Sequence, residues 1–447
     1  MSKSYIIAGA GFRGFCDALA LINQGHTVHM VDPAPFLGGL MYSQEFDGFQ
    51  IDNGVHMFDS IPQDLADIVN EIMEGQTRTI DFVSQSAFNG KVTDGYSLPD
   101  LSSLDEEVRQ RIESELLALA KAERPDTPPA SLGDLFCRNY GETGGVIFCD
   151  IFKSVYGIDA HEIEHTAISQ TSMGRMKFLD DEAMMKLKQD PWLDTILAAR
   201  RKVIGKVDDY VSIYPTTGEG MRGWCDRAKA WLEQKGVNLH LGEKILSMED
   251  TEKGVRITTS KQTLEADKLI WSNDNLSALC SILNVQDKTA DLVHRTALVF
   301  ITFVTAADKI KDFTYLQNFD PQDFTYRTAA AGIYSGQTKE DGTSFITCEC
   351  PTVVGTDFWD TAEDKINEIW DEVRELGIVE QSAELVNANV RKIPVTFKLP
   401  RVGYSEVVAA METEITQTCQ NLVLRSAVPF YRREIYLDSL NLNNCVN

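Results

Sequence analysis

A glycine-rich turn near the start of the chain constrains its fold more than any other feature of the sequence. Residues 4–8 (SYIIA) form a short apolar run, typical of a buried parallel strand, and Gly9-Ala10-Gly11-Phe12-Arg13-Gly14 follows directly. The first glycine allows a tight turn, the second lets the backbone approach a pyrophosphate, and the third lets a helix pack closely on the strand. We therefore predict a strand, a turn that binds a dinucleotide, and a helix.

The next residues complete this pattern. Residues 15–24 carry apolar side chains at helical spacing, and Gly25 is expected to end the helix. Residues 26–31 (HTVHMV) predict a second strand, and Asp32 stands at its end, eighteen positions after Gly14. A carboxylate at this place accepts hydrogen bonds from ribose hydroxyls, while free N–H groups at the helix N-terminus favour phosphate. The order of strand, turn, helix, strand and acid predicts a Rossmann-like α/β domain.

A second pair of glycines bears on which dinucleotide is bound. Gly38 and Gly39 follow Asp32 after five intervening residues. This spacing resembles a second flavin signature of the glutathione-reductase-like flavoproteins, and the resemblance implies FAD rather than NAD. Two residues without Cβ let the backbone pass close to a bulky ligand; a plain turn is the alternative explanation.

Residues 48–58 (GFQIDNGVHMF) extend the resemblance. They are similar to the segment that passes the flavin ring in the amine oxidase, protoporphyrinogen oxidase and UDP-galactopyranose mutase superfamily. The resemblance implies that Gly54, Val55 and His56 lie near the isoalloxazine, and it makes His56 the candidate catalytic residue. A histidine whose hydrogen bonds are satisfied within a turn is the alternative for His56.

Two later segments match the same superfamily. The phrase Tyr-Pro-x-x-Gly-x-Gly-Met at residues 214–221 resembles the return of the chain to the flavin domain, which places Met221 among the cofactor-binding candidates. Residues 421–426 (NLVLRS) resemble the C-terminal flavin contact, with Arg425 as the candidate, although the glycine expected there is replaced. The complete set of cofactor-binding candidates is Gly9, Gly11, Phe12, Gly14, Asp32, Gly38, Gly39, Gly54, Val55, His56, Met221 and Arg425.

The length of 447 residues predicts more than one domain. We expect a discontinuous FAD-binding domain made of residues 1–60, 205–285 and 400–447. An interleaved α+β substrate-binding domain with a helical part would comprise residues 61–204 and 286–399. Its strands are expected at TALVFITFV and GTSFITCEC, and an amphipathic helix is expected over residues 360–377.

Charge and composition exclude several classes of protein. The formal net charge of −25 argues against nucleic acid as a partner, so an anionic substrate would require local arginines. The nine cysteines show no CxxC spacing, and we expect reduced thiols and no metal site. No run of 18 or more apolar residues occurs and no secretory leader is evident, so we expect a cytoplasmic protein without a membrane span.

Three functions remain open at this level. The first is an FAD-dependent oxidoreductase that transfers a hydride from a small organic substrate to the flavin. The second is a flavin-dependent nucleotide-sugar mutase, whose diphosphate substrate would need arginines and tyrosines, and the third is a flavin-fold protein without catalysis. For the oligomeric state, both a homodimer and a monomer remain open. The candidate substrate-binding residues are Arg175, Tyr404, Tyr431 and Arg432.

Overall fold

The structure is a computed structural model that describes residues 2–81, 83–199, 210–425 and 431–442. The chain divides into two compact units, each built from separate stretches of sequence. The first unit comprises residues 1–81, 208–290 and 406–447, and the second comprises residues 82–207 and 291–405.

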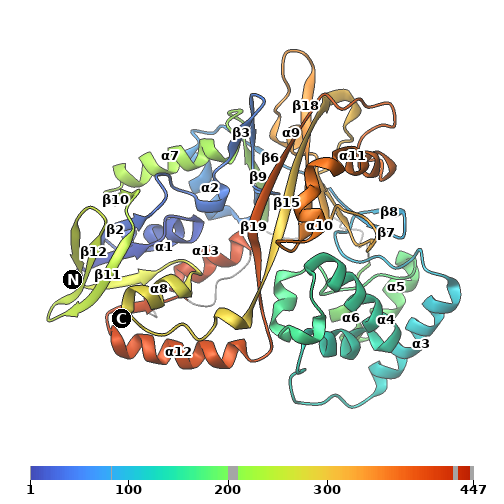
Figure 1. The fold of residues 1–447 in the computed structure, drawn as a ribbon, viewed down its shortest axis with the longest axis horizontal. Coiled ribbons are helices and arrows are strands. Elements are labelled where there is room, and N and C mark those ends of the chain that lie inside the picture. The colour runs from blue at the N-terminus through green and yellow to red at the C-terminus, as the bar shows by residue number, and fades with distance from the viewer. Residues whose placement is uncertain (1, 82, 200–209, 426–430, 443–447) are drawn as a thin grey trace. The chain divides into compact units, whose positions relative to one another are not determined.

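A five-stranded parallel sheet is the centre of the first unit (Figure 1). Its strand order is β10-β2-β1-β14-β20, and every neighbouring pair is parallel. The strands are β1 (Ser4–Ala8), β2 (Thr27–Asp32), β10 (Asn238–Leu241), β14 (Lys268–Trp271) and β20 (Leu422–Leu424). This sheet and the helix that follows β1 confirm the predicted Rossmann-like α/β fold.

Smaller sheets and helices surround the parallel sheet. Three antiparallel strands form a sheet of β11 (Ile245–Thr251), β12 (Gly254–Thr259) and β13 (Thr263–Ala266). Another sheet has the order β5-β9-β6, with β5 (Phe58–Pro62), β9 (Tyr210–Pro215) and β6 (Thr77–Thr79), and a hairpin joins β3 (Gln44–Phe46) and β4 (Phe49–Ile51). The helices of this unit are α1 (Phe12–Ile22), α2 (Gln63–Ile72), α7 (Gly220–Gln234), α8 (Leu276–Leu283), α13 (Arg432–Leu440) and most of α12 (Tyr404–Thr418).

Helix α1 is buried along almost its whole length. Every residue from Phe12 to Leu21 is buried, including the charged Arg13 and Asp17. Gly25 has a φ of 79° and follows the last helical turn, as the sequence predicts, because this left-handed conformation suits glycine. A helix buried on all sides must pair its charged side chains inside the protein, and this requirement shapes the site described below.

The second unit contains a seven-stranded sheet of order β19-β15-β18-β17-β16-β7-β8. All neighbouring pairs are antiparallel except β16 and β7. The strands are β7 (Ser84–Phe88), β8 (Lys91–Asp94), β15 (Val293–Ala306), β16 (Tyr315–Asn318), β17 (Arg327–Ala329), β18 (Thr343–Thr352) and β19 (Asn387–Pro400). The strands expected at TALVFITFV and GTSFITCEC are β15 and β18.

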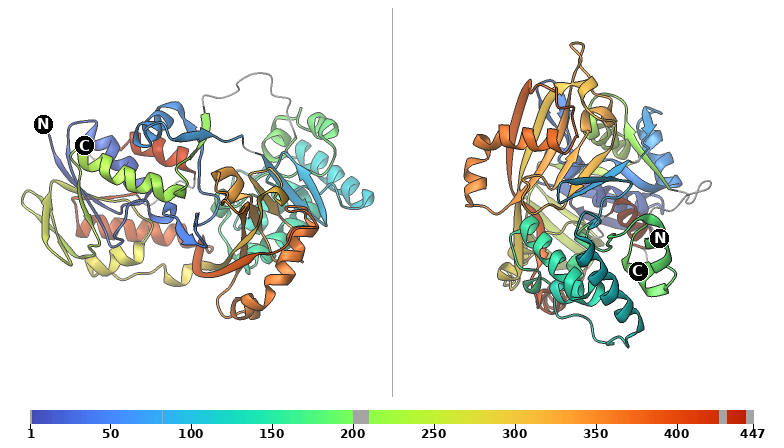
Figure 2. Two further views of the ribbon diagram at one scale, coloured as in Figure 1. Left: turned by 90° about the horizontal axis from the view of Figure 1, so that it is seen from above. Right: turned by 90° about the vertical axis from the view of Figure 1, so that its right-hand side faces the viewer.

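The helices of the second unit fall into two groups. One group contains α3 (Glu106–Lys121), α4 (Leu132–Tyr156), α5 (Asp181–Leu187) and α6 (Pro191–Ile196), which gather together in both views of Figure 2 and share a large apolar core. The other group contains α9 (Ala331–Ser335), α10 (Asp357–Thr361) and α11 (Ile366–Glu375). Trp370 and Val373 of α11 pack into the core beneath the sheet, as the helical periodicity predicts.

The expected boundary at residue 60 differs from the division seen in the structure. Residues 61–81 lie in the first unit, because β5 and β6 pair with β9 and α2 packs against α7. These pairings join segments more than a hundred residues apart, so no local pattern in the sequence predicts them. Among the described residues, no helix combines the length and apolar character needed to cross a membrane.

Candidate functional site

The glycine-rich turn links β1 to α1 and is closed by short backbone contacts. The N–H of Gly9 donates to the carbonyl of Val31 at 2.9 Å, and Gly9 has a φ of 120°. A Cβ on Gly14 would lie 2.0 Å from the carbonyl oxygen of Gly9, so only glycine fits there. The turn therefore requires Gly9 for its backbone conformation and Gly14 for close packing.

Gly11 is different, because the protein itself does not require a glycine at this position. Its φ of −74° is open to any residue, and a Cβ placed on it would meet no atom within 4 Å. Gly11 precedes α1, whose first turn carries no acidic side chain and receives no side-chain cap. Free N–H groups at a helix start beside an open backbone are the arrangement that accommodates a pyrophosphate.

Asp32 lies beside this turn at the end of β2. One carboxylate oxygen accepts the N–H of Ala10 and the other accepts the N–H of Ala34, each at 2.7 Å. These bonds fix the carboxylate against the glycine turn. Since each oxygen of an ionised carboxylate has two acceptor sites, both can still receive a ribose hydroxyl.

Gly38 and Gly39 pack directly against the same turn. The N–H of Gly38 donates to the carbonyl of Ala10 at 2.7 Å, and a Cβ on Gly39 would lie 3.3 Å from the Cα of Gly11. A Cβ on Gly38 would overlap Sγ of Cys225 in α7 at 2.2 Å. The close approaches that explain this glycine pair are thus contacts within the protein, to the glycine turn and to α7.

Asp52 joins two segments that lie far apart in the sequence. It accepts hydrogen bonds from the hydroxyls of Ser43 at 2.5 Å and Tyr214 at 2.7 Å, and from the N–H of Met221 at 3.2 Å. Burial raises the pKa of Asp52 to about 6, and these hydrogen bonds limit the rise. Residues 48–58 are in this way tied to the start of α7. Asp52 was not among the predicted site residues, although it occupies the acidic position of the matched motif.

His56 lies near the start of α13. Nη2 of Arg432 is 2.6 Å from Nδ1 of His56. Because a guanidinium can only donate, Nδ1 accepts this hydrogen bond, and the proton of the neutral ring is on Nε2. Two residues predicted for different roles, one catalytic and one substrate-binding, are therefore neighbours.

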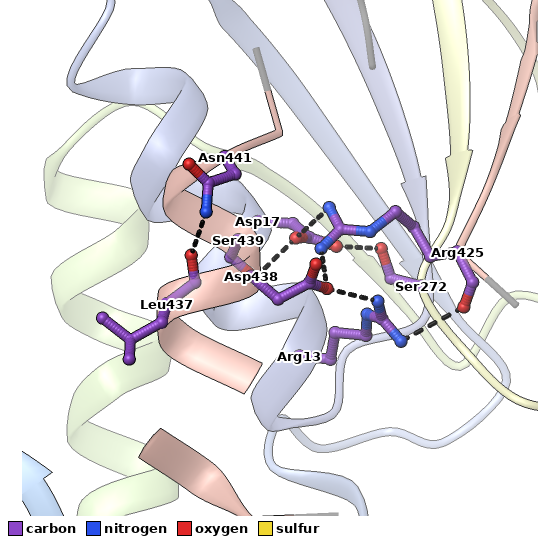
Figure 3. Close-up of polar contacts among 8 residues, drawn as sticks. All are labelled: Arg13, Asp17, Ser272, Arg425, Leu437, Asp438, Ser439 and Asn441. Atoms are coloured by element: carbon purple, nitrogen blue, oxygen red, sulfur yellow. Dashed lines mark hydrogen bonds and ion pairs between the residues drawn. The ribbon is translucent and has the colours of Figure 1, made fainter. Parts of the chain in front are cut away.

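A buried ionic cluster holds α13 against α1 (Figure 3). Arg425 donates to Asp17 at 3.0 Å and also to Asp438, which accepts Arg13 at 2.8 Å. Ser272 and Ser439 donate their hydroxyls to Asp17 at 2.5 and 2.7 Å. The cluster contains two positive and two negative groups, so its net charge is zero.

This cluster changes the interpretation of Arg425. Its side chain is 5% exposed and pairs with Asp17 and Asp438, so its guanidinium is engaged within the protein. The sequence did not indicate this, because Asp17 and Arg425 are 408 positions apart. Ser426, noted for the replaced glycine motif, lies outside the described residues.

The remaining candidates are divided between the two units. The ring of Phe12 packs against Phe58 and Trp224, with ring centroids 6.0 and 6.1 Å away, and so belongs to the core. Gly54 has a φ of 135° and accepts the N–H of His56 at 2.9 Å, while Val55 between them is half-buried. Tyr431 lies in the first unit, and Arg175 and Tyr404 lie in the second.

Comparisons with known proteins agree with this geometry. A sequence model of the NAD(P)-binding Rossmann-like domain matches residues 7–72, which contain the glycine turn and Asp32. A search of curated proteins finds no match. The agreement with solved structures extends over the whole chain.

Three solved structures illustrate this likeness. A reduced UDP-galactopyranose mutase has a TM-score of 0.74 at 16% identity, covering 100% of this chain and 95% of its own. A candidate protoporphyrinogen oxidase from Exiguobacterium sp. 255-15 has a TM-score of 0.65 at 14% identity, covering 98% and 99%. Wild-type putrescine oxidase bound to putrescine has a TM-score of 0.62 at 13% identity, covering 100% and 98%.

At these identities the likeness concerns the fold and leaves the reaction open. The structural similarity nevertheless covers both units. The similar structures also come from the groups of proteins that the motifs at residues 9–14, 48–58 and 214–221 resemble. The chain has the same fold as these solved structures, and its residues 7–72 match the NAD(P)-binding Rossmann-like domain.

Proposed function

We propose that this protein binds FAD along the Gly9–Gly14 turn and is an FAD-dependent oxidoreductase acting on a small organic substrate. One observation carries the cofactor assignment. Gly11 leaves open space at the uncapped start of α1, next to the carboxylate of Asp32. The protein gains nothing in its own packing from a glycine at position 11, whereas a bound pyrophosphate would require one.

The described residues fit this cofactor. The N–H groups at the start of α1 would hold the pyrophosphate, and Asp32 would accept the ribose hydroxyls. The nearby arginines Arg13 and Arg425 are neutralised by Asp17 and Asp438, so the phosphate charge would be met chiefly by backbone N–H groups. FAD is favoured over NAD because the likeness to superfamily members extends over both units.

Side chains of the first unit have defined roles in this proposal. A bound flavin supplies the hydride acceptor. His56 keeps the catalytic role that the motif suggests, and the proton of its neutral ring is at Nε2 because Arg432 donates to Nδ1. Asp52 fixes the segment that carries Gly54, Val55 and His56 to the start of α7.

The absorption spectrum of the purified protein tests the cofactor assignment. Bound oxidised flavin gives absorption bands at about 375 and 450 nm, which are characteristic of the cofactor itself. We expect these bands in the protein or after incubation with FAD, and bleaching under anaerobic conditions by a candidate amine or other oxidisable substrate. A protein that stays colourless with excess FAD would contradict the proposal and favour a flavin fold without catalysis.

A flavin-dependent nucleotide-sugar mutase is the second candidate. The TM-score of 0.74 with UDP-galactopyranose mutase exceeds the values of 0.65 and 0.62 for the two oxidases named above. The basic and aromatic start of α13, with Tyr431, Arg432 and Arg433, also suits a phosphorylated sugar. A mutase would be active only after reduction by dithionite or NADPH, without net consumption of the reductant. An oxidoreductase would instead consume its acceptor in proportion to product.

A further inference from the structure

A cavity of about 140 Å³ lies within the second unit. The loop between β16 and β17 contributes Asp320, Asp323 and Phe324 to its lining. Ser154 of α4 and Phe358 of α10 line it as well. Ser154 is exposed and the two phenylalanines are half-buried, so a ligand can enter from solvent. We call this space the β16–β17 cavity.

Aromatic rings form much of the apolar lining of the β16–β17 cavity. The ring centroids of Phe324 and Phe358 lie 5.0 Å apart, with an angle of 40° between the ring planes. Tyr326 and Pro351 add to this lining. An apolar cavity of about 150 Å³ is large enough to bind benzene. The β16–β17 cavity can therefore accommodate a ligand about the size of a single six-membered ring.

Hydrogen bonds within the loop fix the two carboxylates of the lining. Asn318, which is 2% exposed, donates from Nδ2 to Oδ2 of Asp323 at 2.8 Å. Its Oδ1 accepts the N–H of Asp320 at 3.0 Å. Oδ1 of Asp320 in turn accepts the N–H of Gln322 at 3.1 Å. Each carboxylate therefore uses one oxygen for a hydrogen bond within the loop.

The second oxygen of each carboxylate is open to a ligand. Among the residues that the structure describes, no donor contacts Oδ1 of Asp323 or Oδ2 of Asp320, and neither carboxylate pairs with a basic side chain. Burial raises the pKa of Asp323; the hydrogen bond from Asn318 opposes this rise, and the negative charges of Asp320 and Glu375 add to it. A carboxylate that is partly removed from water beside like charges favours a positively charged partner.

We propose that the β16–β17 cavity binds a small planar organic cation, an amidinium or a guanidinium. Its N–H groups donate to the open oxygens of Asp320 and Asp323, and its flat faces lie against the rings of Phe324 and Phe358. A planar cation suits this lining, because such groups pair strongly with carboxylates and also stack on aromatic faces. The site goes beyond the proposed flavin chemistry and does not depend on it, since every residue that lines the cavity belongs to the second unit.

Benzamidine and benzamide test this proposal as a matched pair. They have the same ring and nearly the same shape, but only benzamidine is positively charged at neutral pH. Each is titrated into the full-length protein in the presence of FAD at constant ionic strength, and binding is measured by calorimetry. We expect benzamidine to bind at least about tenfold more tightly than benzamide. Equal binding of the two compounds, or no binding of benzamidine, would overturn the proposal.

Substitution of the two carboxylates locates the binding site. Asp323→Asn and Asp320→Asn each keep an oxygen for the hydrogen bond within the loop and remove one negative charge. We expect each to weaken benzamidine binding by about ten- to a hundredfold. Asp312→Asn is the control, because it removes an equal charge from an exposed residue that precedes β16, and it should leave binding unchanged. Benzamidine binding that is equal in the wild type and in both cavity variants would contradict the assignment.

Melting temperatures separate a binding role of these carboxylates from a structural one. Since neither carboxylate has a basic partner to lose among the described residues, Asp323→Asn and Asp320→Asn should melt at the same temperature as the ligand-free wild type or higher. Benzamidine should raise the melting temperature of the wild type and have a much smaller effect on the two variants. A marked decrease in the melting temperature of both ligand-free variants would show that the fold itself uses these charges and would overturn the proposal.

Discussion

Asp52 shows how one buried side chain joins parts of the sequence that lie far apart. Its oxygens accept hydrogen bonds from Ser43, Tyr214 and Met221, and it is 4% exposed. The raised pKa means that the folded protein binds a proton at Asp52 more tightly than the unfolded chain does. Protonation of Asp52 therefore favours the folded state.

This linkage predicts a pH-dependent difference between the wild type and Asp52→Asn. The stabilisation from protonation is complete below the ordinary pKa of 3.8 and is lost as the pH rises through about 6. On lowering the pH from 7 to 4, the unfolding free energy of the wild type should gain about 2–3 kcal/mol relative to Asp52→Asn. Urea unfolding of both proteins across this pH range measures the difference in unfolding free energy. A difference that does not change with pH would contradict the raised pKa of Asp52.

Two glycines of the same turn differ in whether the protein has room for a side chain. Gly14→Ala places a Cβ 2.0 Å from the carbonyl oxygen of Gly9, whereas Gly11→Ala places one in open space. We expect Gly14→Ala to lower the unfolding free energy of the cofactor-free protein by about 2–4 kcal/mol. Gly11→Ala is the matched control and should differ from the wild type by less than about 0.5 kcal/mol. Equal effects of the two substitutions on urea unfolding would be inconsistent with this turn geometry.

At the scale of elements, α13 is held by charges that it shares with α1 and the end of β20. Asp17 is fully buried, and its partners are Arg425, Ser272 and Ser439. Removal of one member of a buried ion pair leaves an uncompensated charge, which costs more than the pair itself contributes. Arg425 is the member of this cluster that pairs with both Asp17 of α1 and Asp438 of α13.

Arg425→Gln tests this attachment. We expect it to lower the unfolding free energy by about 3–5 kcal/mol and to speed amide exchange in residues 432–440. Arg256→Gln is the control, because it also removes an arginine with two carboxylate partners, but on the exposed surface of β12. It should have a much smaller effect. Similar small losses in both variants would show that the buried cluster does not hold α13.

Local sequence patterns predicted individual helices and strands. They did not predict the contacts between elements that lie far apart in the sequence. The periodicity of residues 360–377 predicted an amphipathic helix, and α11 lies within this range with Trp370 and Val373 buried. The glycine turn was readable because its requirements lie within six consecutive residues. The partners of Arg425 could not be predicted from the sequence, because they lie on helices that only the tertiary fold brings together. The pairing of Arg327 with Glu349 likewise depends on the register of β17 and β18, which no single segment encodes.

At the scale of the whole molecule, both units are assembled from separate stretches of chain. The proposed cofactor contacts at Gly11, Asp32 and His56 all belong to the first unit. A ligand stabilises the state that binds it by an amount set by its concentration relative to its dissociation constant, about 2.7 kcal/mol at a hundredfold excess. Protection by FAD should therefore be concentrated in the first unit.

Hydrogen exchange with and without FAD measures this distribution. We expect FAD to slow exchange in residues 4–41 and 214–234, with smaller changes in α3 to α6. An exposed segment such as α3, which has no proposed cofactor contact, provides the internal control. Protection confined to residues 82–207 would contradict the placement of FAD in the first unit.

The most direct test of the account is the affinity for FAD of the wild type and of Gly11→Val, measured by equilibrium titration with flavin fluorescence. A Cβ at position 11 meets no atom within 4 Å and the backbone there is extended, so we expect the variant to fold, and urea unfolding of the cofactor-free protein checks this. It should bind FAD at least about a hundredfold more weakly, because its side chain would occupy the place of the pyrophosphate. Equal FAD affinity in a folded Gly11→Val protein, or no FAD binding by the wild type, would contradict the cofactor site.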